Sequence, residues 1–229
     1  MTAATIPRGG RVRVAGVDDD TIIRDGLQLL LPQLDVVATF ADAESLLAAR
    51  PQVDVVLLDL KLDGTGRELS LRGIDAVRAV AAAGHRVLVY TNERRRAVLA
   101  ACLTVGALGI AHKAEPLDAL ADAVAQVAAG HIVITQALTG LAEVADRRGR
   151  LPALSPRERQ VLAGRARGES FRSIAARLYV SEKTAAGYME QVKAKFAAYL
   201  RDHSPADLEY SLGLEPADLP DRYPHDPAP

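Results

Sequence analysis

The sequence has one cysteine, no long apolar run and almost no net charge, and each shortage excludes a class of protein. With Cys102 alone, the chain can form neither an internal disulfide nor a cysteine metal cluster. No uninterrupted apolar stretch reaches the ~18 residues of a transmembrane helix, and residues 1–10 lack the apolar core of a signal peptide. We therefore expect a cytoplasmic protein without membrane contacts, in which Cys102 is a small buried residue of a helix.

The net charge of −1 conceals an uneven distribution along the 229 residues. Residues 151–200 hold nine Lys and Arg against four Asp and Glu, a net charge of +5. Residues 201–229 hold two against seven, a net charge of −5. The chain is long enough for two modest domains, and its basic block is a candidate site for an anionic partner.

Apolar strands alternate with helices in the first half of the chain. The central strand, residues 53–59, is a nearly continuous apolar run, which is typical of a strand buried on both faces of a parallel sheet. This alternation predicts an α/β fold with a doubly wound, five-stranded parallel sheet. The expected strands are residues 11–17, 35–40, 53–59, 86–91 and 107–112, and the expected helices are residues 21–31, 43–50, 74–83, 93–105 and 117–129.

Polar side chains stand where four of these strands end, and the ends of parallel strands meet at one edge of the sheet. Carboxylates held at close range need a cation, and oxygen ligands of this kind suit Mg²⁺. Such a carboxylate can attack phosphorus, while a hydroxyl and an ammonium group bind the phosphoryl oxygens. The alternative is a set of solvated acidic residues without chemistry. The residues concerned are Asp18, Asp19, Asp20, Asp59, Thr91 and Lys113.

Four motifs resemble the receiver domain of two-component response regulators: Val17-Asp18-Asp19, Leu57-Leu58-Asp59-Leu60, Thr91 after VLVY, and Gly106-Ala107-Leu108-Gly109 leading to Lys113. The resemblance implies a flavodoxin-like fold in which Asp59 accepts a phosphoryl group from a sensor histidine kinase. It also implies that Thr91 and Lys113 bind that group. The implied Mg²⁺ ligands are Asp18, Asp19, Asp59 and the backbone carbonyl of Lys61.

The sequence departs from this family at several positions near the site. Residues 62–64 read Leu-Asp-Gly where the family usually has Met-Pro-Gly, and the loop from Asp59 to Gly73 is longer than usual. Ile110 stands where an aromatic switch residue is expected, and Asn92 follows Thr91 where a small residue is common. These differences predict unusual switching and leave control without phosphate open.

Residues 62–65 also resemble part of the motif of haloacid-dehalogenase-like phosphatases. That motif needs an aspartate two residues before Asp63, and Lys61 stands there. We therefore expect no phosphatase, and no enzyme acting on a diffusible substrate.

After a charged connector that ends in Pro152, the sequence predicts a series of helices. Ser155-Pro156-Arg157-Glu158 is a capping box, and Ser170 and Ser181 are caps of the next two helices. A short fourth helix is expected over residues 204–212. In the third helix, the expected buried stripe is Ala185, Tyr188, Val192, Phe196 and Tyr199.

Two short helices joined by a tight turn are typical of a helix-turn-helix motif. Residues 154–162, 174–178 and 180–184 resemble the LuxR-type DNA-binding domain, and a receiver followed by this domain is the arrangement of the NarL/FixJ family. The expected organisation is a receiver over 11–129, a linker over 130–152, an all-α LuxR-type helix-turn-helix domain over 153–214, and a disordered acidic, proline-rich tail over 215–229.

The resemblance places Ala186, Gly187 and Glu190 against DNA. Alanine and glycine cannot hydrogen-bond a base edge through a side chain, and Glu190 repels phosphates unless it accepts from a cytosine amine. We expect salt-dependent and modestly specific DNA binding. The candidate anchors, each of which is alternatively a solvated surface group, are Arg172, Arg177, Lys183, Thr184, Lys193 and Lys195.

The sequence thus favours a homodimeric transcription factor that binds double-stranded DNA and is controlled by phosphorylation of Asp59. The altered recognition helix and the long loop after Asp59 keep a second hypothesis open. In that hypothesis, an atypical receiver acts through a protein partner, with weak or relict DNA binding and phosphate-independent control.

Overall fold

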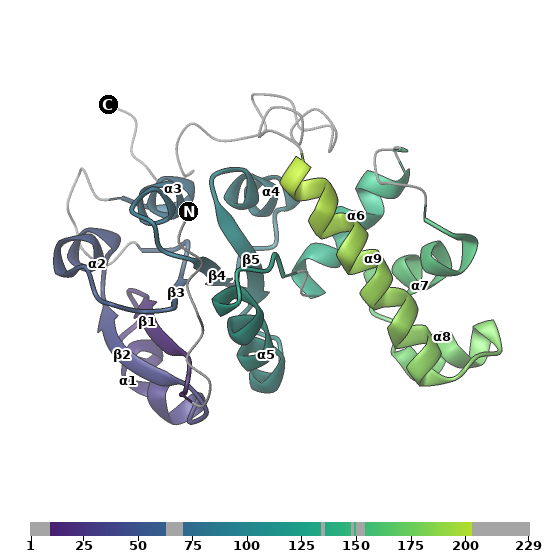
Figure 1. Cartoon of the computed structure of the whole chain (residues 1–229), viewed down its shortest axis with the longest axis horizontal. Helices are drawn as coiled ribbons and strands as arrows, with labels where there is room; N and C mark the ends of the chain where they lie inside the picture. The colour runs from purple at the N-terminus through teal and green to yellow at the C-terminus, as the bar shows by residue number, and fades with distance from the viewer. Residues whose placement is uncertain (1–9, 63–70, 134–135, 148, 150–153, 203–229) are drawn as a thin grey trace. The chain divides into compact units, whose positions relative to one another are not determined.

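The computed structural model describes residues 10–62, 71–133, 136–147, 149 and 154–202 (Figure 1). The chain divides into two compact units, one formed by residues 1–93 and 105–133 and the other by residues 94–104 and 134–229. Part of the long loop after Asp59, the expected fourth helix over 204–212 and the expected tail over 215–229 lie outside the described residues.

The first unit contains a five-stranded parallel sheet with the strand order β2-β1-β3-β4-β5. This is the flavodoxin-like order of a doubly wound fold, so the predicted fold class is confirmed. Each strand lies within about two residues of its predicted bounds, because the apolar runs match the buried segments. The strands are β1 (Arg13–Val17), β2 (Asp35–Phe40), β3 (Val55–Leu58), β4 (Val87–Thr91) and β5 (Ala107–His112).

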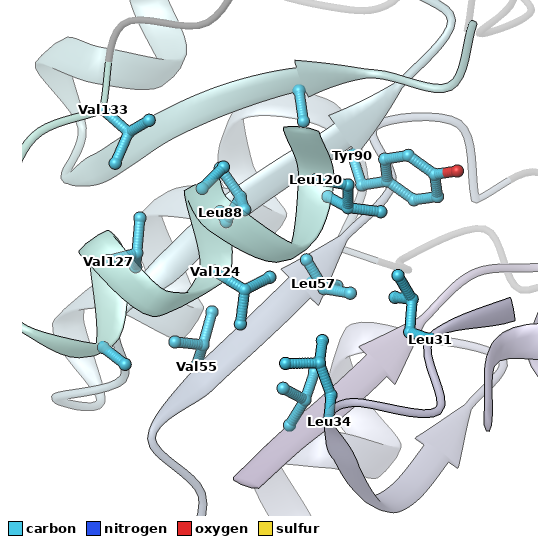
Figure 2. Close-up of a cluster of buried hydrophobic side chains, with 14 of the residues drawn as sticks. Leu31, Leu34, Val55, Leu57, Leu88, Tyr90, Leu120, Val124, Val127 and Val133 are labelled. Carbon is cyan, nitrogen blue, oxygen red and sulfur yellow. The ribbon is translucent and has the colours of Figure 1, made fainter. Parts of the chain in front are cut away.

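One face of this sheet is covered by α1 (Thr21–Leu30) and α5 (Leu117–Ala128). Figure 2 shows side chains of α5 and of the α1 end packed against those of the strands. The second face carries α3 (Gly73–Ala82), which contacts β4 and β5, and α2 (Ala43–Ala49), which contacts β2. The labelled core residues include Leu31, Val55, Leu57, Leu88, Leu120, Val124 and Val127.

A glycine lets α1 lie close to β1. A Cβ atom on Gly16 would lie 2.7 Å from Leu27 Cδ2, so the Leu27 side chain or the helix would have to shift. Gly16 precedes Val17 and Asp18, so this close approach lies next to the loop between β1 and α1.

The last leucines of α1 and of its cap differ in exposure. Leu27 is buried and Leu30 is 42% exposed, whereas Leu31 is fully buried. The helix ends at Leu30, and Leu31 caps it by donating its backbone N–H to Leu27 O. The chain leaves the helical path there, so helical spacing no longer decides which leucine faces the core.

The second unit contains one helix that the sequence analysis did not predict. α6 (Gln136–Arg147) lies in the expected linker, and it contacts both α4 (Arg96–Thr104) and α7 (Pro156–Ala166). Cys102 lies on α4 and is fully buried, as predicted. Among the described helices, none has the length and apolar character needed to span a membrane.

The helix-turn-helix consists of α8 (Phe171–Leu178) and α9 (Glu182–Asp202), which pack on α7. Tyr188 of the predicted buried stripe is only half-buried, and Met189 takes its place with 2% exposure. Both choices fit helical spacing, so the sequence alone could not decide between the adjacent residues. The buried residues of α9 include Ala185, Met189, Val192, Phe196 and Tyr199.

A second glycine brings α7 and α8 together. A Cβ atom on Gly164 would lie 2.9 Å from side-chain atoms of both Ile174 and Arg177. A larger residue at position 164 would therefore require the side chains of Ile174 and Arg177 to shift.

The buried carboxylate of Glu158 stabilises this unit through the predicted capping box. Its Oε2 accepts hydrogen bonds from the Ser155 amide and from Lys195 Nζ at 2.8 Å, while its own amide donates to Ser155 Oγ. Burial alone would raise the pKa of this carboxyl, but Lys195 and Ser155 outweigh it and lower the pKa.

We predict that Glu158→Gln lowers the free energy of unfolding of the second unit by about 1 kcal/mol at neutral pH. Since the folded-state pKa is lowered, this contribution is present above the unfolded pKa of about 4.3 and is lost as pH falls through the folded value. Urea titrations followed by circular dichroism should therefore show a difference in the free energy of unfolding between the wild type and Glu158→Gln. This difference should disappear in acid. Glu182→Gln, at a more exposed carboxylate, is the control, and a difference independent of pH contradicts the prediction.

Candidate functional site

The carboxyl ends of the parallel strands bring the predicted site residues of the first unit together. The sheet hydrogen bonds continue into the site: the Asp59 amide donates to Val17 O at 2.9 Å, and the Lys113 amide donates to Thr91 O at 2.8 Å. Backbone bonds thus fix the residues from which the functional side chains extend.

Two carboxylates and one ammonium group form a buried cluster at this edge. Asp18 and Asp59 are only 4% and 6% exposed. Lys113 Nζ lies 2.7 Å from Asp18 Oδ2 and 2.6 Å from Asp59 Oδ2. The fold thus joins three residues that are distant in the sequence into one ion-paired group. Lys113 lies 95 residues after Asp18 and 54 after Asp59.

The electrostatics of the cluster follow from burial and pairing. Burial raises the pKa of the Asp18 carboxyl, and its bonds with Lys113 and the Asp20 amide offset this only in part. Burial favours neutral Lys113, but the two carboxylates outweigh it and raise the pKa of its ammonium group. Lys113 therefore stays charged at neutral pH, and its single positive charge offsets part of the negative charge of the cluster.

Asp59 and Thr91 are each oriented by a backbone amide. The Leu60 amide donates to Asp59 Oδ1 at 2.7 Å, and Oδ2 points to Lys113. The Glu93 amide donates to Thr91 Oγ1 at 3.2 Å, so the hydroxyl keeps its own hydrogen for donation. The structure thus combines a fixed carboxylate, a hydroxyl donor and a cation, as the sequence predicted.

The carboxylate oxygens of Asp18, Asp19 and Asp59 lie within 4.8 Å of one another. A group of carboxylate oxygens at this separation is the donor type that Mg²⁺ binds in proteins. The acidic cluster therefore fits the predicted cation. Lys61 has an exposed side chain, and its predicted contribution through the backbone carbonyl stays a prediction.

The sequence analysis missed two residues beside this cluster. Arg24 Nη1 donates to the backbone oxygen of Asp18 at 2.6 Å, and Lys113 Nζ lies 5.8 Å from the centre of the Tyr90 ring. Arg24 and Tyr90 also line a cavity of about 10 Å³ next to Asp18 and Asp59, which has room for about one water molecule. Arg24 lies outside the motifs that identified the other site residues, and Tyr90 stands in one of them, VLVY, without having been given a role.

The outer face of the helix-turn-helix carries the predicted DNA-binding residues. Lys183, Thr184, Gly187 and Glu190 are exposed on α9, whereas Ala186 is half-buried. No atom lies within 4 Å of a Cβ placed on Gly187, so this part of the helix surface is open. The turn residue Tyr179 is 95% exposed and has a left-handed φ of 55°.

Most of the predicted cationic anchors form ion pairs within the second unit. Arg172 lies 3.0 Å from Glu182, Arg177 lies 2.9 Å from Glu169, and Lys193 lies 2.9 Å from Glu190. Lys195 is paired with Glu158 and is part of the capping interaction rather than of the outer face. Among the described residues, Lys183 has no carboxylate within ion-pair distance.

Both halves of the chain match known families. Residues 14–125 match the family described as "Response regulator receiver domain", and residues 152–203 match "Bacterial regulatory proteins, luxR family". The chain is 35% identical over 195 residues to the response regulator RamR of Streptomyces coelicolor, covering 83% of this chain and 92% of RamR. The chain belongs to the NarL/FixJ family of response regulators.

Other members of the NarL/FixJ family show the same relationship across both domains. The chain is 30% identical to the transcriptional activator DevR/DosR of Mycobacterium tuberculosis, covering 80% of this chain and 88% of that protein. Among solved structures, a complex of the response regulator RcsB with DNA matches with 24% identity and a TM-score of 0.52. That match covers 90% of this chain and 99% of the RcsB chain. At that identity the structural match supports the fold alone.

We predict that Lys113→Ala increases the affinity of the first unit for Mg²⁺. Removing the ammonium group leaves two buried carboxylates without their cation, and their repulsion is relieved by a metal ion. Calorimetric titration with MgCl₂ should show tighter binding than in the wild type. Lys61→Ala, which leaves the backbone carbonyl in place, should bind like the wild type. Unchanged or weaker binding by Lys113→Ala would show that Lys113 does not compete with the cation.

Proposed function

We propose that Asp59 accepts a phosphoryl group from a sensor histidine kinase and that this controls DNA binding by the LuxR-type domain. The observation that carries the proposal is the buried cluster of Asp18, Asp59 and Lys113, with Thr91 at the adjacent strand end. Members of the family are cytoplasmic transcription regulators, and we propose the same location and role for this chain.

In the proposed reaction, an oxygen of the Asp59 carboxylate attacks the phosphorus atom, and the bond from phosphorus to the histidine nitrogen of the kinase breaks. Lys113 moves its ammonium group from the carboxylates to an oxygen of the incoming phosphoryl group. The hydroxyl of Thr91 donates a hydrogen bond to a second oxygen. Asp18, Asp19, Asp59 and the Lys61 carbonyl would hold Mg²⁺, which would supply positive charge to the transferring group.

The redistribution of charge provides a physical basis for switching. Before phosphorylation, Lys113 is bound by Asp18 and Asp59, and Thr91 accepts from the Glu93 amide. A phosphoryl group competes with the carboxylates for Lys113 and accepts the hydrogen of the Thr91 hydroxyl, so it can move the loops that follow β4 and β5. Ile110 is fully buried in β5, so the proposed switch does not use an aromatic ring at that position.

The output is proposed to be a dimer that binds a two-fold DNA site through α9. A dimer matches the symmetry of such a site and gives each recognition helix one half-site. Lys183 and Thr184 at the first turn of α9 are the proposed phosphate contacts. The comparisons do not favour the alternative of a receiver that acts only through a protein partner.

We predict that Asp59→Asn abolishes stable phosphorylation by phosphoramidate, because an amide is a far poorer nucleophile than a carboxylate. The measurement is intact-protein mass spectrometry before and after acid treatment, which tests for an acid-labile phosphoryl group. Asp122→Asn, on the exposed face of α5, is the control and should be phosphorylated like the wild type. Undiminished phosphorylation of Asp59→Asn would place the acceptor elsewhere.

We also predict that Lys183→Ala weakens binding to every duplex by a similar factor and lowers the salt slope of binding by about 0.9, the value for one phosphate contact. Fluorescence anisotropy with DNA selected by the full-length protein, at several salt concentrations, measures both effects. If Lys183→Ala binds like the wild type at all salt concentrations, this residue does not contact phosphate.

A further inference from the structure

The cations on the helix-turn-helix surface are nearly balanced by carboxylates. Between residues 169 and 193 there are four cations (Arg172, Arg177, Lys183 and Lys193) and three anions (Glu169, Glu182 and Glu190), which leaves a net charge of +1. Three of the four cations are in ion pairs with these three anions. The net charge of +5 over residues 151–200 therefore overstates the positive charge of the DNA-facing surface.

Two of these ion pairs involve the recognition helix itself. Glu182, in the first turn of α9, holds Arg172 of α8 at 3.0 Å, so this pair joins the two helices of the motif. Glu190 holds Lys193 at 2.9 Å on the turn that follows the open surface at Gly187. Glu182 and Glu190 are 55% and 68% exposed at their side chains, so approaching DNA meets both carboxylates.

The ion pairs are too weak to hold their cations against DNA. Water and salt screen exposed pairs of this kind, which therefore contribute little to stability, so a phosphate can take the cation away from its carboxylate. The carboxylate then remains unpaired beside the DNA and repels the phosphates. DNA binding gains favourable free energy when condensed counterions are released, and this repulsion offsets part of that gain. The effect is the same for any duplex, whatever its sequence.

A helix-stabilising role explains only part of this arrangement. Glu182 favours the N-terminus of α9, and the spacing of Glu190 and Lys193 suits a stabilising helical pair. Neither effect requires Arg172 of another helix to be the partner of Glu182. Helix stabilisation also does not explain why both carboxylates lie on the exposed side of α9, next to the open surface at Gly187.

We propose that Glu182 and Glu190 act as an electrostatic filter against sequence-independent DNA binding. They lower the affinity of the helix-turn-helix for duplexes in general, so that stable binding requires the additional contacts of a correct base sequence. This inference rests on the proposed DNA-binding function, and it assigns these two residues a role in discrimination rather than in attachment.

The test compares full-length wild type, Glu182→Gln, Glu190→Gln and the double variant on a random-sequence duplex and on a duplex selected by the wild type. Glutamine keeps the size of the side chain and removes its charge. Each single variant should remove one negative charge from the DNA-facing surface and steepen the salt slope on random DNA by about 0.9. Between 50 and 200 mM salt, each variant should then lose roughly 3.5-fold more affinity than the wild type loses.

In low salt the variants should bind random DNA more tightly than the wild type, and the ratio of selected to random affinity should fall. Glu143→Gln is the matched control, because Glu143 pairs with Arg147 on α6 rather than on α8 or α9. It should bind both duplexes like the wild type. Circular dichroism of each variant verifies that the second unit is folded.

Three results overturn the filter. If the wild type selects a recurring site but the variants show the same slope and affinity on random DNA, the carboxylates do not restrain binding. If Glu190→Gln loses affinity for the selected duplex and gains none on random DNA, Glu190 reads a base instead. If neither the wild type nor any variant binds DNA, the proposed DNA-binding function itself fails and the filter with it.

Discussion

The ion pairs of Lys113 with Asp18 and Asp59 are the interaction on which the first unit depends. Each of the three residues comes from a different strand end, so the cluster exists only if β1, β3 and β5 keep their order and register. Burial makes the arrangement demanding, because removing one member of a buried ion pair typically costs ~3–5 kcal/mol. The same property makes the site responsive, since any group that changes the charge of Asp59 forces Lys113 and Asp18 to find new partners. Stability and responsiveness therefore originate in the same three side chains.

The fold of both units could be predicted where the sequence pattern and the packing agree. The strands are short apolar runs bounded by polar residues, and α7 and α8 begin at the serine caps Ser155 and Ser170. Prediction from the sequence was wrong where the local pattern fits two neighbouring residues equally well. Tyr188 and Met189 are adjacent and both apolar, and only packing against α7 and α8 decides that Met189 is buried. Helix α6 was missed although Leu138, Leu141 and Val144 follow helical spacing, because the charged residues up to Pro152 marked the whole segment as a linker. Its contacts come from α4 and α7.

The candidate site was predictable to a similar degree. Asp59, Thr91 and Lys113 follow from their positions at strand ends, which a parallel sheet brings to one edge. Arg24 was missed because its role depends on a hydrogen bond to a backbone oxygen of Asp18, which no side-chain pattern records. On the helix-turn-helix surface the cations were identified but their partners were not. The ion pair of Arg172 with Glu182 spans ten residues and joins two helices, so it becomes visible only once the helices are packed.

The close approach of α7 and α8 at Gly164 has a consequence for how such a surface can change. The atom of Arg177 that a Cβ at this position would meet is Nη2, which is also the atom that pairs with Glu169. A single methyl group added between the helices would therefore displace a guanidinium group from its carboxylate on the outside of the domain. Mutational drift at an uncharged interior position can in this way alter the electrostatic potential that a polyanion encounters, while every charged residue of the surface stays the same.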